Sequence, residues 1–247
     1  PPRPAPAWRP PRPTAGGRPV ALVADTFTRY LHPAAGDAAV RVLTAAGASV
    51  QVVDPGCCGR ALLSQGLVSA ARRTARRALD RLAPHALAGR PIVVLEPSCW
   101  SMLADDLPDL LPDDPRARWV AESARTFERA LLDLGGLELR PAGETDVLVH
   151  AHCHARALGG GADALAALRL LPHAIVRESG AGCCGMAGAF GLLHPELSRR
   201  IAEQRLAPAA RAAGAVVAAG SSCRAQVERT TGRPALHPAE HLAAHLP

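Results

Sequence analysis

Short apolar runs alternate with longer amphipathic stretches along most of the chain. The apolar runs predict buried strands at residues 20–24, 49–53, 92–95, 147–149, 174–176 and 215–218. Stretches with apolar residues three or four positions apart predict helices at residues 33–46, 69–87 and 119–134. Strands that alternate with helices are typical of parallel sheets covered on both faces, so the predicted fold class is α/β.

The two halves of the chain carry the same cysteine pattern. A Cys-Cys-Gly sequence follows a predicted strand at Cys57 and again at Cys183, and a Ser-Cys pair follows a later strand at Cys99 and again at Cys223. The two spacings agree within two residues. An internal duplication explains this agreement, and it predicts two pseudo-symmetric βα repeats with cysteine loops at the carboxyl ends of the strands.

The repeats differ at the end of their first strand. In the second half this strand runs into His150-Ala-His-Cys-His154, whereas in the first half it ends at Asp25-Thr-Phe without a cysteine. Asp25 is therefore expected where the first repeat would have its leading cysteine. If the histidines continue the strand, His152 should face away from His150 and His154, because side chains alternate along a strand.

The repeats suggest a division of the chain into three parts. Residues 1–18 are rich in proline and predict a linker or an unordered arm. Residues 19–140 form the first, degenerate repeat, and residues 141–247 form the second. The chain starts with Pro1 and has no secretory signal, which suggests that it follows another domain.

Seven cysteines are the main chemical resource of the sequence. An odd number excludes complete disulfide pairing within one chain, and the missing secretory signal favours a reducing compartment, the cytoplasm. Adjacent cysteines are too close for an unstrained disulfide, but their two thiolates can bind different irons of one cluster. The predicted cofactor-binding residues are Cys57, Cys58, Cys99, Cys153, Cys183, Cys184 and Cys223.

Three other interpretations of the cysteines remain open. Zinc also accepts four thiolates, although the short Cys-x₂₋₄-Cys pairs typical of zinc sites are missing. The cysteines could instead be small buried residues, or a Cys-Cys pair could perform thiol–disulfide chemistry. His154 is a candidate to line the site or carry protons, or to be a hydrogen-bonded structural residue. No catalytic side chain is predicted.

The formal net charge of +6 comes entirely from arginine, since the chain contains no lysine. A basic surface can bind nucleic acid, but only 3% of the residues are aromatic, so few rings are available to stack on bases. Arginine on solvated helix faces is the better explanation, and no nucleic-acid partner is expected. No apolar run is long enough for a transmembrane segment.

The combination of motifs resembles the cysteine-rich CCG domain that occurs in heterodisulfide reductase and in the glycolate oxidase iron–sulfur subunit. It resembles more closely the C-terminal portion of FAD-linked D-lactate and D-2-hydroxyglutarate dehydrogenases. The resemblance extends from about residue 19 to the C-terminus. The motifs that carry it are residues 25–33, Cys57-Cys-Gly-Arg60, Leu95-Glu-Pro-Ser-Cys99, His152-Cys-His154, residues 182–191 and Ser222-Cys-Arg224.

The resemblance implies that this chain is an iron–sulfur electron-transfer module of a flavin-linked 2-hydroxyacid dehydrogenase. It implies metal ligands at Cys153, Cys183, Cys184 and Cys223, which would hold a [4Fe–4S] cluster, conceivably of the noncubane type. The implied partners are an FAD-binding domain or subunit and a ferredoxin-type iron–sulfur segment, and peripheral attachment to the inner face of the membrane through such partners is compatible with it.

Two sequence features limit what the resemblance implies. Met102 and Gln226 stand where heterodisulfide reductase has a further cysteine, so a five-cysteine site is not expected. The chain also has no G-x-G-x-x-G at a helix start and no ferredoxin cysteine run. FAD is therefore expected on an upstream domain or a partner subunit, and the isolated chain is not expected to turn over alone.

Overall fold

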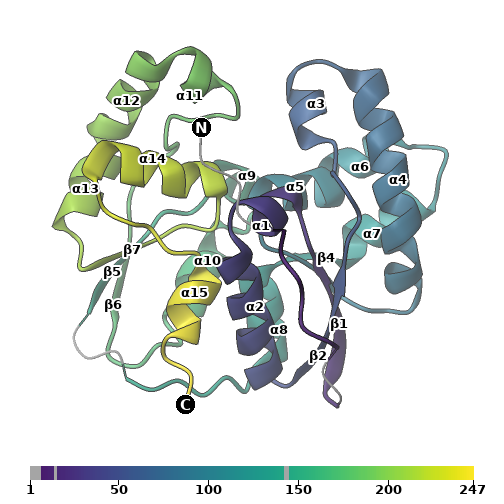
Figure 1. The fold of residues 1–247 in the computed structure, drawn as a ribbon, viewed down its shortest axis with the longest axis horizontal. Coiled ribbons are helices and arrows are strands. Elements are labelled where there is room, and N and C mark those ends of the chain that lie inside the picture. The colour runs from purple at the N-terminus through teal and green to yellow at the C-terminus, as the bar shows by residue number, and fades with distance from the viewer. Residues whose placement is uncertain (1–6, 14–15, 142–144) are drawn as a thin grey trace. The chain divides into compact units, whose positions relative to one another are not determined.

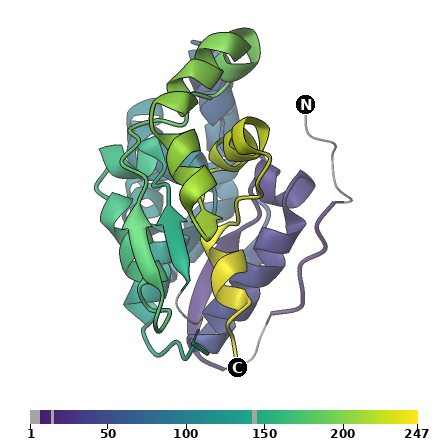
Figure 2. The ribbon, with the colours of Figure 1, turned by 90° about the vertical axis from the view of Figure 1, so that its left-hand side faces the viewer.

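The computed structural model describes residues 7–13, 16–141 and 145–247. The chain divides into two compact units, Pro1–Leu137 and Glu138–Pro247. Figure 1 labels the helices and strands of both units, and Figure 2 shows the same ribbon from the side. Each unit contains a parallel sheet, which confirms the predicted α/β fold with two βα repeats.

The first unit contains a four-stranded sheet in the order β2-β1-β3-β4, and all neighbouring strands are parallel. Its strands are β1 (Arg18–Val23), β2 (Ala48–Val53), β3 (Ile92–Val94) and β4 (Ala124–Thr126). Its helices are α1 (Thr26–Tyr30), α2 (Pro33–Ala45), α3 (Arg60–Ser64), α4 (Val68–Leu87), α5 (Pro97–Ser101), the π-helix η1 (Met102–Asp106), α6 (Leu107–Leu110), α7 (Arg116–Ser123) and α8 (Phe127–Leu134).

Helices cover both faces of this sheet. Successive side chains of β1 point to opposite faces, and Ala21 and Val23 pack in one apolar cluster with Leu79 of α4 and Val120 of α7. The helices α2 and α8 contact each other and the sheet, and Figure 1 shows them side by side. Burying a side chain such as Leu79 contributes about 1.5–3 kcal/mol, so these two layers stabilise the sheet.

The predicted helix at residues 119–134 is wrong in its middle. The structure has α7, then β4 and then α8 in this region, and β4 pairs with β3 as the edge strand of the sheet. The Thr126 hydroxyl accepts a hydrogen bond from the Arg129 amide at 3.1 Å and so begins α8. Pairing with β3 overrides the local helical pattern, because a strand gains its hydrogen bonds from a neighbour that is distant in sequence.

The proline-rich N-terminal segment is anchored where the structure describes it. Trp8 is buried, its indole donates a hydrogen bond to Asp37 at 2.7 Å, and its backbone amide donates to the Arg29 carbonyl. Gly36 allows the indole to lie against α2, since a Cβ there would approach the ring to 2.7 Å. The rest of the predicted linker, residues 1–6 and 14–15, lies outside the described residues.

The second unit repeats the strand order of the first in a three-stranded parallel sheet, β6-β5-β7. Its strands are β5 (Asp146–Val149), β6 (Ile175–Glu178) and β7 (Ala215–Val217). Its helices are α9 (Cys153–Ala157), α10 (Gly161–Leu168), α11 (Phe190–Leu193), α12 (Pro195–Gln204), α13 (Leu206–Ala212), α14 (Ser221–Thr231) and α15 (Pro238–Ala243).

An isolated bridge extends the likeness between the units. Leu236 pairs in parallel with Val217 of β7, in the place that β4 takes beside β3. His237 then begins α15 as its N-cap, as Thr126 begins α8. All six predicted strands are present, and β4 is the strand that the apolar pattern missed.

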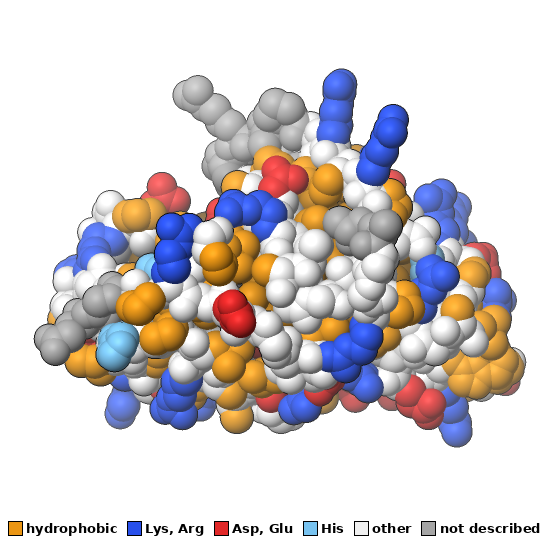
Figure 3. All heavy atoms as spheres, turned by 90° about the horizontal axis from the view of Figure 1, so that it is seen from below, with side chains coloured by type: hydrophobic (Ala, Val, Ile, Leu, Met, Phe, Trp, Pro, Cys, Tyr) orange, Lys and Arg blue, Asp and Glu red, His pale blue; other side chains and the backbone are white. Residues whose placement is uncertain are grey.

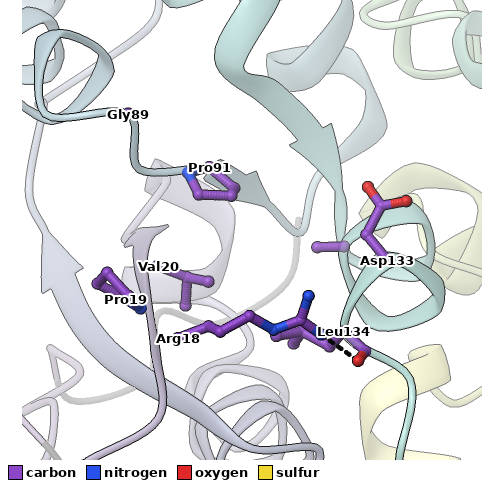
Figure 4. A pocket seen from close by; sticks show the side chains of 8 residues that line it. Arg18, Pro19, Val20, Gly89, Pro91, Asp133 and Leu134 are labelled. Atoms are coloured by element: carbon purple, nitrogen blue, oxygen red, sulfur yellow. Dashed lines mark hydrogen bonds between the residues drawn. The ribbon is translucent and has the colours of Figure 1, made fainter.

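The described part of the first unit has a cavity of about 300 Å³ at the amino ends of β1 and β3. Arg18, Val20, Pro91 and Asp133 are among the residues that line it, and Arg18 donates a hydrogen bond to the Leu134 carbonyl (Figure 4). The cavity lies at the opposite end of this sheet from the cysteine loops, which follow the carboxyl ends of the strands.

Arginine side chains are interspersed with carboxylates on the face shown in Figure 3. Several arginines form ion pairs within their own unit, such as Arg177 with Asp146 at 2.7 Å and Arg211 with Glu203 at 2.6 Å. These pairs explain part of the arginine content without a nucleic acid, whose absence as a partner stays a prediction. None of the helices in the described residues has the length and apolar character of a membrane span.

Candidate metal centre

Three loops of the second unit bring cysteines to one edge of its sheet. Cys153 opens α9 after β5, Cys183 and Cys184 follow β6, and Cys223 lies in the first turn of α14 after β7. Because β5 lies between β6 and β7, the three loops leave the sheet at adjacent points. This edge is where open α/β sheets hold their ligands.

The four thiols interact in a row. Cys153 donates a hydrogen bond to Cys183, Cys184 also contacts Cys183, and Cys184 interacts in turn with Cys223. Cys184 and Cys223 are buried, whereas Cys153 and Cys183 are partly exposed. All four cysteines predicted to bind the metal therefore lie together. That they are its ligands stays a prediction.

Hydrogen bonding divides these thiols into two kinds. The pKa of Cys183 is lowered because Cys153 and Cys184 donate to it, and the pKa of Cys223 is lowered because Cys184 donates to it and His152 is close. The pKa values of Cys153 and Cys184 are raised, first by the hydrogen bonds they donate and then by burial. A cation bound here would take the place of the remaining thiol protons.

His150 is a nitrogen donor at this site that sequence reasoning did not assign to it. A ring nitrogen of His150 and the sulfurs of Cys184 and Cys223 all lie within 4.8 Å of one another. The ring is 1% exposed, and its Nδ1 lies 2.9 Å from the Ser179 hydroxyl. The available signal was a polar residue directly after a buried strand, which the alternation of three histidines obscured.

The predicted strand alternation of the histidines is wrong. β5 ends at Val149, and His152 is the N-cap of α9, where its Nδ1 accepts a hydrogen bond from the His154 amide at 3.1 Å. The rings of His152 and His154 lie edge to face, 5.3 Å apart. Once the chain turns into a helix, the two-residue period of a strand no longer places its side chains.

Two glycines leave the space that this arrangement needs. A Cβ on Gly220, the N-cap of α14, would lie 2.3 Å from Cδ2 of His152 and 3.3 Å from the sulfur of Cys223. Gly185 has a φ of +91°, and its amide donates to the Cys183 sulfur at 3.3 Å. The Cys-Cys-Gly turn thus requires glycine for its backbone conformation and supplies an N–H group to the thiol.

The first unit has a similar group of three thiols. The sulfurs of Cys58 and Cys99 are 3.2 Å apart, and Cys57 shares a hydrogen bond with Cys58. The Gly59 amide donates to the Cys57 sulfur at 3.4 Å, as the Gly185 amide does to its cysteine. The cofactor-binding role predicted for these three cysteines stays a prediction.

The fourth position of this group is Thr26, not Asp25 as the sequence predicted. Asp25 is the N-cap of α1 and so occupies the place of His152, the N-cap of α9. Thr26 is the first residue of its helix, as Cys153 is, and its side chain bonds Cys57 as Cys153 bonds Cys183. Counting from the ends of the strands placed the alignment one residue too early.

Two buried carboxyl groups lie beside the first-unit thiols. Burial and then the charge of Glu96 raise the pKa of Asp25 to about 6. The pKa of Cys99 is raised: a hydrogen bond from Cys58 lowers it, but burial and the charges of Asp25 and Glu96 outweigh that bond. Nearby negative charge disfavours a thiolate, so these thiols hold their protons more firmly than those of the second unit.

The donor set of the second unit fits a thiophilic metal centre. It offers four thiols and one imidazole nitrogen, which are the ligands preferred by iron–sulfur clusters and by zinc. The first unit offers three thiols, a hydroxyl and two carboxyl groups. It matches such a centre less well, because hydroxyl and carboxyl oxygens are harder ligands.

A family model for the CCG cysteine-rich domain matches residues 26–104 and 147–228. The chain belongs to the CCG cysteine-rich domain family. The two matched stretches contain all seven cysteines, one Cys-Cys-Gly sequence each, and the sheets from which the cysteine loops emerge. The resemblance to a CCG domain seen in the sequence is confirmed.

Curated relatives of this CCG protein are parts of dehydrogenases. It is 29% identical over 92% of its length to the C-type subunit of the anaerobic glycerol-3-phosphate dehydrogenase of Escherichia coli, covering 59% of that protein. It is 29% identical over 95% of its length to the D-2-hydroxyglutarate dehydrogenase of Pseudomonas putida, covering 23% of it. It is 26% identical over 71% of its length to the glycolate oxidase iron–sulfur subunit of Escherichia coli, covering 45% of it.

The CCG chain therefore spans less than two thirds of the relatives it matches. The relatives named here are oxidoreductases or oxidoreductase subunits, and one carries iron–sulfur in its name. They share with this chain the region in which the cysteines lie.

Proposed function

We propose that the chain is an iron–sulfur electron-transfer module of a flavin-linked dehydrogenase that oxidises a 2-hydroxyacid of the D-lactate, glycolate or D-2-hydroxyglutarate type. The observation that carries the proposal is the meeting of four thiols at the carboxyl edge of the β6-β5-β7 sheet. Membership of the CCG family and the iron–sulfur subunit among the relatives support it.

The second unit would hold the cluster, with Cys153, Cys183, Cys184 and Cys223 as its ligands. A bound iron–sulfur cluster supplies one-electron transfer. Four thiolates suit a [4Fe–4S] cluster, and the adjacent Cys183 and Cys184 would bind different irons. Partial exposure of Cys153 and Cys183 leaves one side of the site open to an electron donor or acceptor.

The residues around the thiols would hold the site ready for metal. The Gly185 amide donates to the Cys183 sulfur, and a hydrogen bond to a ligating sulfur favours its thiolate form. Burial of Cys184 and Cys223 excludes water from the inner side of the site. Both effects act on the reduction potential of a cluster held here.

FAD would lie on an upstream domain or a partner subunit, together with a ferredoxin-type iron–sulfur segment. The extra length of the relatives leaves room for such parts. We place the protein in the cytoplasm, where free thiols persist, with attachment to the inner face of the membrane only through partners. The relatives' names include glycerol-3-phosphate, which is an alcohol and not a 2-hydroxyacid, so the substrate is the least constrained part of the proposal.

Anaerobic purification followed by iron, sulfide and zinc quantification tests the proposal. We expect a brown protein with several irons and sulfides per chain, whose broad visible absorption bleaches with dithionite. A colourless protein with one zinc per chain would instead indicate a structural or docking domain. Activity that survives metal removal but is lost in Cys183→Ser would indicate thiol–disulfide chemistry.

A further inference from the structure

His150 is held in place from both sides of its strand. It is the first residue after β5, and its amide donates to the Val217 carbonyl of β7 at 2.9 Å. Its Nδ1 lies 2.9 Å from the hydroxyl of Ser179, whose own amide is tied to the Val149 carbonyl. The imidazole is therefore fixed by two neighbouring strands.

The other ring nitrogen of His150 has no such partner. Nε2 is fully buried, and it makes no hydrogen bond with any of the residues that the structure describes. Leaving a buried polar atom unpaired costs about 1–3 kcal/mol, which a folded protein rarely accepts without compensation. The neighbours of this ring are the sulfurs of Cys184 and Cys223, within 4.8 Å.

Ser179 determines which nitrogen is free to bind a metal. Its oxygen lies 3.3 Å from the Ala181 amide and accepts that hydrogen bond, and it has a second lone pair for the Nδ1–H of His150. With the proton on Nδ1, the lone pair of Nε2 points away from Ser179. Histidines that bind metals characteristically donate their other N–H group to an oxygen in this way.

His152 has a different task. Its Nδ1 accepts the His154 amide as the N-cap of α9, so this nitrogen is already used by the backbone. His150 makes no contact of that kind among the described residues and is the histidine grouped with two thiols.

We propose that His150 is a direct ligand of the metal centre in the second unit, through Nε2, beside the thiols of Cys184 and Cys223. Ser179 is the positioning residue that holds the proton on Nδ1. The inference rests on the proposed function, and it adds a nitrogen to a site that the cysteine pattern alone describes as all-sulfur.

Pulsed electron paramagnetic resonance on the anaerobically purified full chain tests this assignment. Protein labelled with ¹⁵N-histidine is compared with unlabelled protein in a paramagnetic state of the cluster. We expect the strong hyperfine coupling of a directly bound imidazole nitrogen, which changes with the isotope. The coupling should vanish in His150→Gln and persist in His194→Gln, a substitution of an exposed histidine in the turn between α11 and α12.

The wild-type spectrum alone decides the question if His150→Gln does not fold. Iron and sulfide bound without any strongly coupled nitrogen would overturn the ligand assignment and leave the proposed function intact. Absence of iron and sulfide from the same sample would overturn the proposed function and this assignment with it. In Ser179→Ala we expect iron loss to a chelator to be roughly tenfold faster, because the outer partner of a ligand tunes its affinity. An unchanged rate would contradict the positioning role.

Discussion

The two cysteine sites share one backbone plan but differ in their chemistry. In both units a strand leads into a capped helix, a Cys-Cys-Gly turn donates its glycine amide to the first cysteine, and a helix after the third strand carries the last cysteine. The first unit has Thr26 where the second has Cys153. Duplication of a fold therefore does not by itself duplicate a metal site.

A second exchange fills equivalent space with opposite charge. The N-caps of the helices that carry the last cysteines are Gly220 in the second unit and Glu96 in the first. The His152 ring occupies the space beside Gly220, whereas the first unit pairs the smaller Asp25 with the larger Glu96. Imidazoles favour neighbouring thiolates and carboxylates disfavour them, so the second unit is the better prepared for a cation.

The largest expected effect comes from removing one central thiol from each site. We expect Cys184→Ser to lower the iron content roughly tenfold or more, because a proposed ligand is lost from the only complete set of four thiols among the described residues. The matched substitution Cys58→Ser should keep most of the iron and the visible spectrum. Equal losses in the two variants would show that both units hold metal.

Restoring the missing thiol should sharpen the comparison next. Thr26→Cys gives the first unit four thiols in the arrangement of the second, and we expect it to bind one additional Co²⁺ per chain. Intense sulfur-to-cobalt charge-transfer absorption measures the binding, with Thr28→Ser as a control at a nearby threonine. If Thr26→Cys binds no extra cobalt, the carboxyl groups of Asp25 and Glu96 or the local geometry decide the difference, and the thiol count does not.

Gly220→Ala tests the space that His152 occupies. A Cβ there would lie 2.3 Å from the ring, so we expect a loss of about 1–3 kcal/mol in the free energy of unfolding and slower cluster loading. Denaturant titration measures the loss. Gly182→Ala is the matched control, since a Cβ at Gly182 meets nothing within 4 Å. Equal stability of the two variants would contradict the crowding at Gly220.

The smallest expected effect concerns the buried carboxyl of the first unit. The pKa of Asp25 is about 6 in the folded protein and 3.8 as the reference value, so folding favours its protonated form. The corresponding stability is present below pH 3.8 and is lost as the pH rises through about 6. Between about pH 7.5 and about pH 4, we expect the wild type to gain about 2 kcal/mol relative to Asp25→Asn.

Denaturant titrations of both proteins across this pH range measure the difference. The amide side chain introduced by Asp25→Asn keeps an oxygen for the backbone amides of Phe27 and Thr28. Asp25 accepts hydrogen bonds from these amides at 2.9 and 3.0 Å, so the start of α1 should be preserved in the variant. Parallel pH profiles of the two proteins would show that Asp25 does not titrate in this range.

The sequence by itself determined the α/β class, six of the strands, the family and the set of four cysteines in the second unit. Apolar runs and repeated cysteine motifs are local patterns, and the chain retains them whatever its tertiary contacts. Tertiary structure decided β4, whose hydrogen bonds come from β3, and the exchange of Cys153 for Thr26, which depends on where each helix begins. It also decided the place of His150, because only the pairing of β5 with β6 and β7 brings its ring to Ser179, Cys184 and Cys223.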